Sequence, residues 1–310
     1  MRLEGEIDDL LLPYKVDLSL IHQIESRALL EHIRRVGKII YQKKREAAAK
    51  NKVSRNRIQK SRQTPKSPPA SNPPIHPWRV CPYGQHQVIE HPRNNSPSKS
   101  HPDGSVSNVH WHCAHNPSGK DQLYPDEIRE IATRHFSGLR NRPCPISLGF
   151  PNGSKYDDLI AGWVQYWSEV LKPSQPLDPN LVKALIASES SFNPKKINKN
   201  KDPDSARGLM QITNDARKLL DDDTELKDHQ ITATKKDLDD PCVNICAGVR
   251  WLFRKREIAS IVRLKRQATW IEAAEEYKGD LEGLLKGNKK SRKDVAPFLK
   301  YLREIDKCRK

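Results

Sequence analysis

The stretch Ala184-Leu185-Ile186-Ala187-Ser188-Glu189-Ser190-Ser191-Phe192-Asn193-Pro194 decides the fold of the C-terminal half of this chain. Apolar residues recur at helical spacing through Leu185 and Ile186, and Asp178-Pro179 is a strong helix start because Asp caps and Pro fits the first position. Glu189 follows the apolar face of this helix. A carboxyl group beside apolar side chains resists ionisation, which a general acid needs near neutral pH. The competing interpretation is a glutamate at a frayed helix end in water.

A second segment, Ser205-Ala206-Arg207-Gly208-Leu209-Met210-Gln211, follows shortly after the first. A Gly-led run of apolar and amide side chains can line a groove for a long polar substrate. Met210 is an equally good core residue by its type. Tyr277, further along, is by its helical context alone a packing residue.

Four motifs in order resemble those of family 1 lytic transglycosylases, relatives of goose-type lysozyme. Two match fully: Glu189-Ser190-Ser191-Phe192-Asn193-Pro194, and Gly208-Leu209-Met210-Gln211 with Ser205 before it. The third is partial, with Asp240-Pro241, Asn244-Ile245 and Gly248. The fourth, Glu276-Tyr277-Lys278-Gly279, departs at two positions from the family's Ala-Tyr-Asn before a Gly. The resemblance covers about residues 155–305.

The resemblance implies a mainly α, lysozyme-like catalytic domain that acts on peptidoglycan. Glu189 would be the single acid/base that cleaves the β-1,4 bond between N-acetylmuramic acid and N-acetylglucosamine and leaves a 1,6-anhydro end. Tyr277 would hydrogen-bond Glu189 and fix its orientation. Two alternatives remain open: a hydrolytic muramidase on the same scaffold, and a non-catalytic protein that binds peptidoglycan or a polyanion.

The resemblance also implies a set of substrate-binding residues. Gln211 and Met210 would line the sugar groove, Ser190 would support the glutamate, and Ser205 and Gly208 belong to the same surface. Lys278 replaces the family's Asn. Because a cation on Glu189 would oppose acid catalysis, Lys278 is expected to point into the groove or to solvent.

Composition bounds the partners of the chain. Its 310 residues are 35% hydrophobic and carry a net charge of +16, which predicts an anionic partner. No run approaches ~20 apolar residues, so no membrane-spanning helix is expected. The run Leu10 to Leu12 is too short for a signal sequence. The sequence therefore predicts synthesis in the cytoplasm and action in the periplasm or cell wall, after delivery by phage, secretion or conjugation machinery.

Four regions are expected along the chain. Residues 1–42 form a helical segment, since apolar residues recur every three or four positions over 16–46. Residues 43–75 form a basic, Pro-rich linker: ten Lys/Arg face one acid over 43–69, typical of a solvated tether or of a segment that binds nucleic acid or another anionic polymer. Residues 76–150 form a small α+β module, and residues 151–310 the helical domain, with helices near 211–220, 241–256, 268–278 and 294–306.

The six cysteines are scattered and are interpreted mostly as free thiols, with Cys242 and Cys246 buried. No cofactor is expected apart from a weakly indicated structural zinc in residues 76–115. Its candidate ligands are Cys81, His86, His112 and Cys113, although their spacing fits no standard zinc finger. The alternative is a module with surface histidines and no metal.

Overall fold

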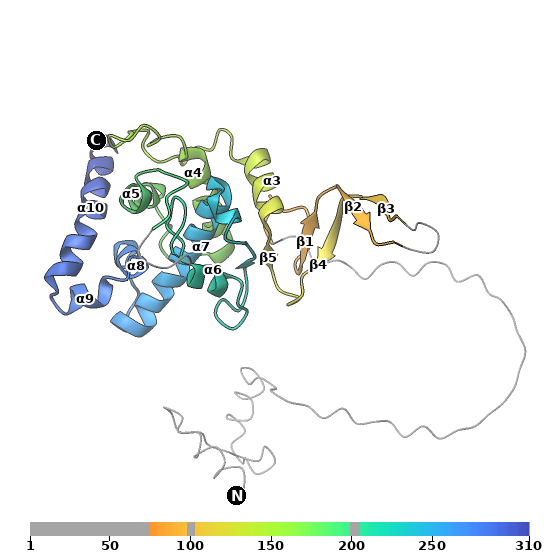
Figure 1. The fold of residues 1–310 in the computed structure, drawn as a ribbon. Helices are drawn as coiled ribbons and strands as arrows, with labels where there is room; N and C mark the ends of the chain where they lie inside the picture. Colours follow the sequence, from red (N-terminus) through yellow and green to blue (C-terminus); the bar gives the residue numbers. More distant parts are fainter. Residues whose placement is uncertain (1–74, 98–102, 199–204, 310) are drawn as a thin grey trace, which may run out of the picture. The chain divides into compact units, whose positions relative to one another are not determined.

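The computed structural model describes residues 75–97, 103–198 and 205–309, which belong to one compact unit (Figure 1). The predicted N-terminal helix over 16–46 and the basic linker over 43–75, with its proposed anionic partner, lie outside these residues except for residue 75. Within the described ranges, no helix is long and apolar enough to cross a membrane.

Helices dominate the described chain, as the sequence predicts, and the C-terminal part is mainly α. The α-helices are α3 (Pro125–His135), α4 (Asp157–Leu171), α5 (Pro179–Ser190), α6 (Asn214–Leu220), α7 (Pro241–Ile258), α8 (Trp270–Tyr277), α9 (Leu281–Leu285) and α10 (Lys289–Asp306). Shorter elements are η2 (Asp237–Asp239), the π-helix η3 (Ala259–Leu264) and η4 (Lys307–Arg309). The predicted start of α5 is confirmed, since the Asp178 carboxylate accepts from the Asn180 backbone N–H and Pro179 occupies the first turn.

The core forms where α7 packs against α3, α4 and α8, while α10 packs along α5. Trp163, Tyr166 and Trp167 of α4 are completely buried in it. The indole of Trp167 donates to the backbone carbonyl of Cys246 in α7 at 3.0 Å, which satisfies the ring nitrogen inside the core. The helix that carries Glu189 is thus held between α10 on one side and α4 on the other.

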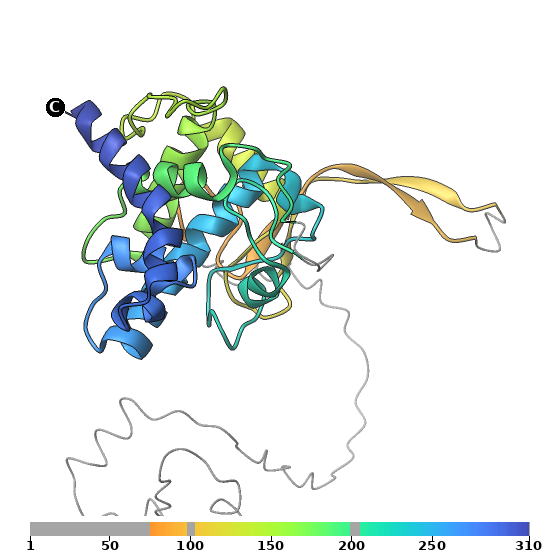
Figure 2. The same cartoon turned by 60° about the vertical axis from the view of Figure 1, so that its left-hand side comes forward.

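The strands form three short pairs. β1 (Gln85–Val88) pairs antiparallel with β4 (His112–His115), and β2 (His91–Asn95) pairs antiparallel with β3 (Ser105–Val109). The β2–β3 ribbon extends away from the helices in both views (Figures 1 and 2). β5 (Gln122–Leu123) pairs in parallel with β6 (Gln230–Ile231). The expectation of an all-helical chain from 155 onward is therefore wrong at β6, because a two-residue strand leaves no periodic signal.

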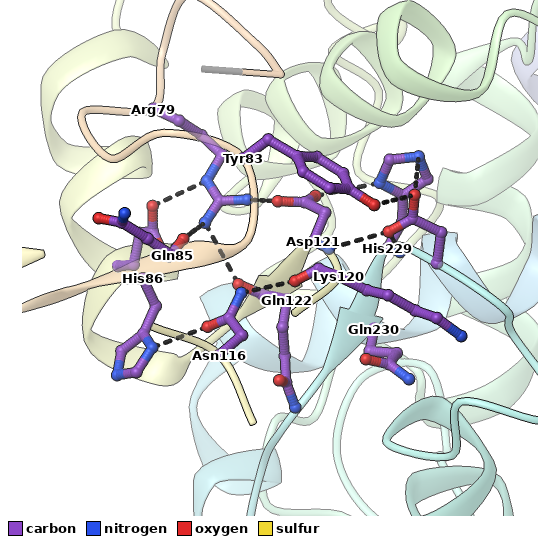
Figure 3. Close-up of polar contacts among 12 residues, drawn as sticks. Arg79, Tyr83, Gln85, His86, Asn116, Lys120, Asp121, Gln122, His229 and Gln230 are labelled. Carbon is purple, nitrogen blue, oxygen red and sulfur yellow. Dashed lines mark hydrogen bonds and ion pairs between the residues drawn. The ribbon is translucent and has the colours of Figure 1, made fainter. Parts of the chain in front are cut away.

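A buried polar network joins the β pairs to the helices (Figure 3). The Arg79 guanidinium contacts the carboxylates of Asp121 and Glu127, and all three side chains are at most 1% exposed. Asp121 also accepts a hydrogen bond of 3.0 Å from the ring of His229, a residue that follows α6 in the chain. The expected boundary at residue 150 falls inside continuous packing, and whether residues 76–150 form a module of their own stays a prediction.

Two disulfides correct the interpretation of most cysteines as free thiols. Cys81 bonds to Cys113 across the β1–β4 region, and Cys144 bonds to Cys308 over a separation of 164 residues. Because the paired cysteines lie far apart in the sequence, their spacing does not indicate which of them bond to each other. Cys242 and Cys246 are buried free thiols, as predicted, and burial raises the pKa of Cys242 to about 12.

The structure contradicts the predicted structural zinc at its two cysteine ligands. Cys81 and Cys113 are bonded to each other and cannot act as thiolates. His86 contacts the Asn116 amide oxygen, and His112 contacts the backbone carbonyl of His110. The disulfide supplies the cross-link that a small, weakly apolar region needs.

Candidate active site

Glu189 lies in the last turn of α5, where the backbone turns sharply. Ser191 and Phe192 both have left-handed backbone conformations, with φ of 54° and 58°, and this ends the helix at Ser190. The turn directs the chain back onto the core, where the Phe192 side chain is fully buried. The Glu189 side chain stays 17% exposed at the helix end. It is therefore partly shielded by the core but open to a ligand.

A lysine contacts this carboxylate directly, contrary to the sequence expectation. The Lys278 ammonium lies 2.7 Å from Glu189 Oε1, and its side chain is 12% exposed. Lys278 follows α8, so the C-terminal end of α8 faces the C-terminal end of α5. The expectation that Lys278 points away into the groove or solvent is wrong, because the carboxylate is the nearest anion that this side chain reaches.

A second lysine near Glu189 was not foreseen. Lys196 Nζ donates to the backbone carbonyl of Glu189 at 2.7 Å. The last carbonyl groups of a helix have no partner within it, and a cation there is favourable. Lys196 thus anchors the loop after α5 to the residue that it must position. Its only sequence signal was a Lys shortly after the helix end.

Tyr277 packs beside the glutamate but does not make the expected hydrogen bond to it. Its hydroxyl donates to the backbone carbonyl of Met210 at 2.7 Å. Burial raises the pKa of the Tyr277 hydroxyl well above its ordinary value, and the charge of Glu189 adds to this effect. The tyrosine therefore links α8 to the second motif and remains a neutral donor.

The second motif is a tight turn locked by a buried amide. Gly208 has φ of +74°, and a Cβ there would lie 2.2 Å from Asn244 Nδ2. Asn244, the buried Asn of the third motif, accepts from the Met210 backbone N–H at 2.8 Å and donates to the carbonyl groups of Arg207 and Leu238. Only glycine fits both the backbone conformation and the contact. The third motif thus supports the second rather than forming part of the surface.

The remaining predicted site residues divide into surface and core. Gln211 is partly exposed, and its amide nitrogen donates to the carbonyl groups of Lys196 and Gly208. Met210 is fully buried, with Gly248 packed against its sulfur, so it does not line the groove. Ser190 is buried and donates to its own helix at Ile186, so it supports the helix and not the carboxylate. Ser205 has a buried hydroxyl without a hydrogen-bond partner among the described residues.

This arrangement is compatible with one class of protein. One partly shielded carboxylate lies at the end of an internal helix of a mainly α domain, a position in which a carboxyl group can serve as a general acid.

Comparison with protein families agrees with this class. Residues 169–261 match the family described as Transglycosylase SLT domain, which supports a lysozyme-like lytic transglycosylase domain in this part of the chain. The match runs from α4 into η3 and includes Glu189, Gly208 and Asn244, whereas Tyr277 and Lys278 lie beyond it. A search of curated proteins found no match.

Proposed function

We propose that the chain cleaves the β-1,4 bond between N-acetylmuramic acid and N-acetylglucosamine with Glu189 as the single acid/base. The position of Glu189 carries this proposal: it is partly shielded at the end of a buried helix, next to the Gly208–Gln211 turn. The match to the transglycosylase family supports the substrate at the level of peptidoglycan. The periplasm or cell wall follows as the site of action, and two disulfides fit an oxidising compartment.

Two proton transfers through the same carboxyl group complete the proposed reaction. Protonated Glu189 donates to the bridging oxygen, and the bond from this oxygen to C1 of the muramic sugar breaks with the electron pair on the leaving N-acetylglucosamine. The substrate's own N-acetyl group stabilises the positive charge at C1. Ionised Glu189 then accepts the proton of the muramic C6 hydroxyl, whose oxygen bonds to C1. No water is consumed, and no second protein carboxylate is needed, unlike in two-carboxylate glycosidases.

The contact with Lys278 constrains the first of these transfers. A carboxylate paired with an ammonium group accepts hydrogen bonds and does not donate a proton. We infer that bound substrate displaces Lys278 from Glu189 before the acid step, and that Lys278 returns when Glu189 becomes ionised. The partial exposure of both side chains leaves room for this movement.

The mass of the soluble products tests the reaction type. Purified peptidoglycan digested with the full chain is expected to give muropeptides one water lighter than the hydrolysed forms. Hydrated ends would instead establish the muramidase alternative, in which water attacks C1. The absence of products would favour a binding protein, for which the Lys278–Glu189 ion pair is the specific observation.

The export route remains a further proposal. Delivery by phage, secretion or conjugation machinery fits an enzyme whose substrate lies outside the cytoplasm. Fusion of the chain to a reporter in cells with and without each machinery would identify the route.

A further inference from the structure

A cavity of about 290 Å³ adjoins the candidate active site without including Glu189. Gln211 and Tyr277 form its border with the site, Trp251 and Lys255 of α7 line it, and Thr213 and Asp215 at the start of α6 line it as well. Neither the proposed reaction nor the four sequence motifs uses the α6 and α7 residues of this cavity. Its lining joins an aromatic ring, hydrogen-bonding groups and one partly buried cation.

Lys255 is the distinctive group of this cavity. Its side chain is 21% exposed, and its ammonium group lies 5.4 Å from the centre of the Trp251 ring. Its nearest carboxylate is Glu276 at 3.9 Å, which is beyond hydrogen-bond distance. Arg263 contacts the same carboxylate at 3.3 Å. Arg263 also pairs with Glu282 at the shorter distance of 2.7 Å, so its charge is met there. Lys255 is left without a carboxylate at hydrogen-bond distance among the described residues.

The other charged group of the cavity does not supply a carboxylate to Lys255. Asp215 has a side chain that is 88% exposed, and it pairs with Lys218 at 3.6 Å on the surface of α6. Thr213 already accepts from the Ala216 backbone N–H as the cap of α6. Burial lowers the pKa of Lys255, and the charge of Glu276 opposes this effect. A carboxylate ligand would supply the close anion that Lys255 lacks.

We propose that this cavity binds a free carboxylate of the peptide substituents carried by the glycan, with Lys255 as the residue that selects peptide-bearing strands. This inference rests on the proposed function and deepens it. The sugar rings of the substrate present neutral hydroxyl and acetamido groups, which do not call for an ammonium group. The anionic groups that accompany these sugars are the carboxylates of the attached peptides. Lys255 therefore fits the peptide, and Gln211 fits the adjoining sugars.

The test compares two forms of one substrate. Initial rates of the full chain and of Lys255→Met are measured on intact peptidoglycan strands and on strands whose peptide carboxylates have been converted to amides, both far below saturation. Lys255→Met is expected to lower the rate on strands with free carboxylates by about tenfold, as for loss of a charge-assisted hydrogen bond, and to leave the rate on amidated strands unchanged. An equal loss on both substrates, or no loss on either, would overturn the proposal.

Two further variants control for charge and folding. Lys255→Arg keeps the cation and is expected to retain part of the preference for strands with free carboxylates. Lys265→Met removes an exposed cation at the end of η3, outside the cavity lining, and is expected to change neither rate.

A direct binding measurement separates failure of this inference from failure of the proposed function. Calorimetry with a synthetic stem peptide, with its carboxylates free or amidated, needs no catalysis. The free acid is expected to bind the wild-type chain at least about tenfold more tightly than the amide, and Lys255→Met is expected to abolish this difference. If the wild-type chain cleaves neither substrate but shows this difference, the catalytic proposal alone fails. If both peptide forms bind equally or not at all, the carboxylate site is refuted.

Discussion

Helix α5 contributes one residue to each of two lysine–carboxylate pairs. The two pairs differ in their access to solvent. Lys183, near its middle, lies 2.9 Å from Asp157 of α4, and the two side chains are 0% and 3% exposed. Glu189, at its end, lies 2.7 Å from Lys278, and those side chains are 17% and 12% exposed. The first pair also holds the backbone carbonyl of Cys144, to which Lys183 donates at 2.6 Å.

This difference separates a structural pair from one that substrate can open. Burial raises the pKa of Asp157 to about 6 and lowers that of Lys183, so desolvation opposes both charges despite their contact. Replacing both residues by apolar side chains costs little stability, whereas replacing only one leaves a buried charge without its partner. The Glu189 pair keeps contact with solvent, and in the proposed reaction a sugar takes the place of its lysine. The same chemistry on one helix therefore serves folding at one point and, under this proposal, catalysis at another.

Replacing only one partner of the buried Lys183–Asp157 pair has the largest expected effect on stability. Lys183→Met leaves the Asp157 carboxyl buried without its cation, and the free energy of unfolding is expected to fall by about 3–5 kcal/mol. Urea denaturation followed by tryptophan fluorescence measures it. The double variant Lys183→Met/Asp157→Leu is the matched control and should recover most of the loss. A cost below about 1 kcal/mol for the single variant would show that the pair is solvated.

Removing the long-range disulfide tests the same region by another route. Cys144→Ser/Cys308→Ser is expected to lower the free energy of unfolding by about 2–4 kcal/mol, because the unfolded chain gains freedom over 164 residues. The segment at Cys144 also loses the tether that presents its carbonyl to Lys183. Reducing agent should destabilise the wild-type chain, whereas an unchanged denaturation midpoint would contradict this account of the bond.

Opening the exposed pair is expected to affect activity and not folding. Lys278→Asn restores the family's residue and removes the cation that must leave Glu189 before the proposed acid step. We expect a rate on peptidoglycan higher by about fivefold, equivalent to about 1 kcal/mol, with stability changed by less than that amount. Lys286→Asn, which removes an exposed cation paired with Glu282 on α9, is the control and should leave the rate unchanged. A large loss of activity in Lys278→Asn would instead make Lys278 a required catalytic group.

A third pair predicts a smaller effect that depends on pH. His76 is 2% exposed and contacts Glu169 of α4 at 2.8 Å, and burial lowers the pKa of His76 below its usual value despite this contact. The unfolded chain then binds more protons than the folded one around and below pH 6.5, so stability falls on acidification through that window. His76→Gln should have a smaller drop in melting temperature between about pH 7.5 and about pH 5. An identical drop in both proteins would remove His76 from the account.

Local signals in the sequence carried much of the fold and indicated Glu189 as the candidate acid. Asp178-Pro179 and Asp240-Pro241 begin α5 and α7 because capping depends on neighbouring residues. Contacts between distant residues were beyond such signals. The Cys144–Cys308 bond, the β5–β6 pair and the Lys278–Glu189 contact each join residues at least 89 apart in the chain.

The type of a residue was also a poor guide to its role where the side chain is buried. Met210 and Ser190 belong to motifs that were expected to surround a sugar groove, yet both side chains are buried and serve packing or the helix itself. Tyr277 was placed beside Glu189, but its hydroxyl had a nearer acceptor in the Met210 carbonyl. The motifs thus indicated which segments meet, and the packing determined which atoms touch.

The central claim, that Glu189 is the acid/base, is tested most directly by mass spectrometry of the soluble products of Glu189→Gln. Gln keeps the size of the side chain but cannot donate or accept the proton. Glu304→Gln, on the partly exposed side of α10, is the matched control. The account predicts anhydro-muropeptides from the wild-type chain and from Glu304→Gln, and a loss of at least about 10²-fold with Glu189→Gln. Anhydro products at the wild-type rate from Glu189→Gln would contradict it.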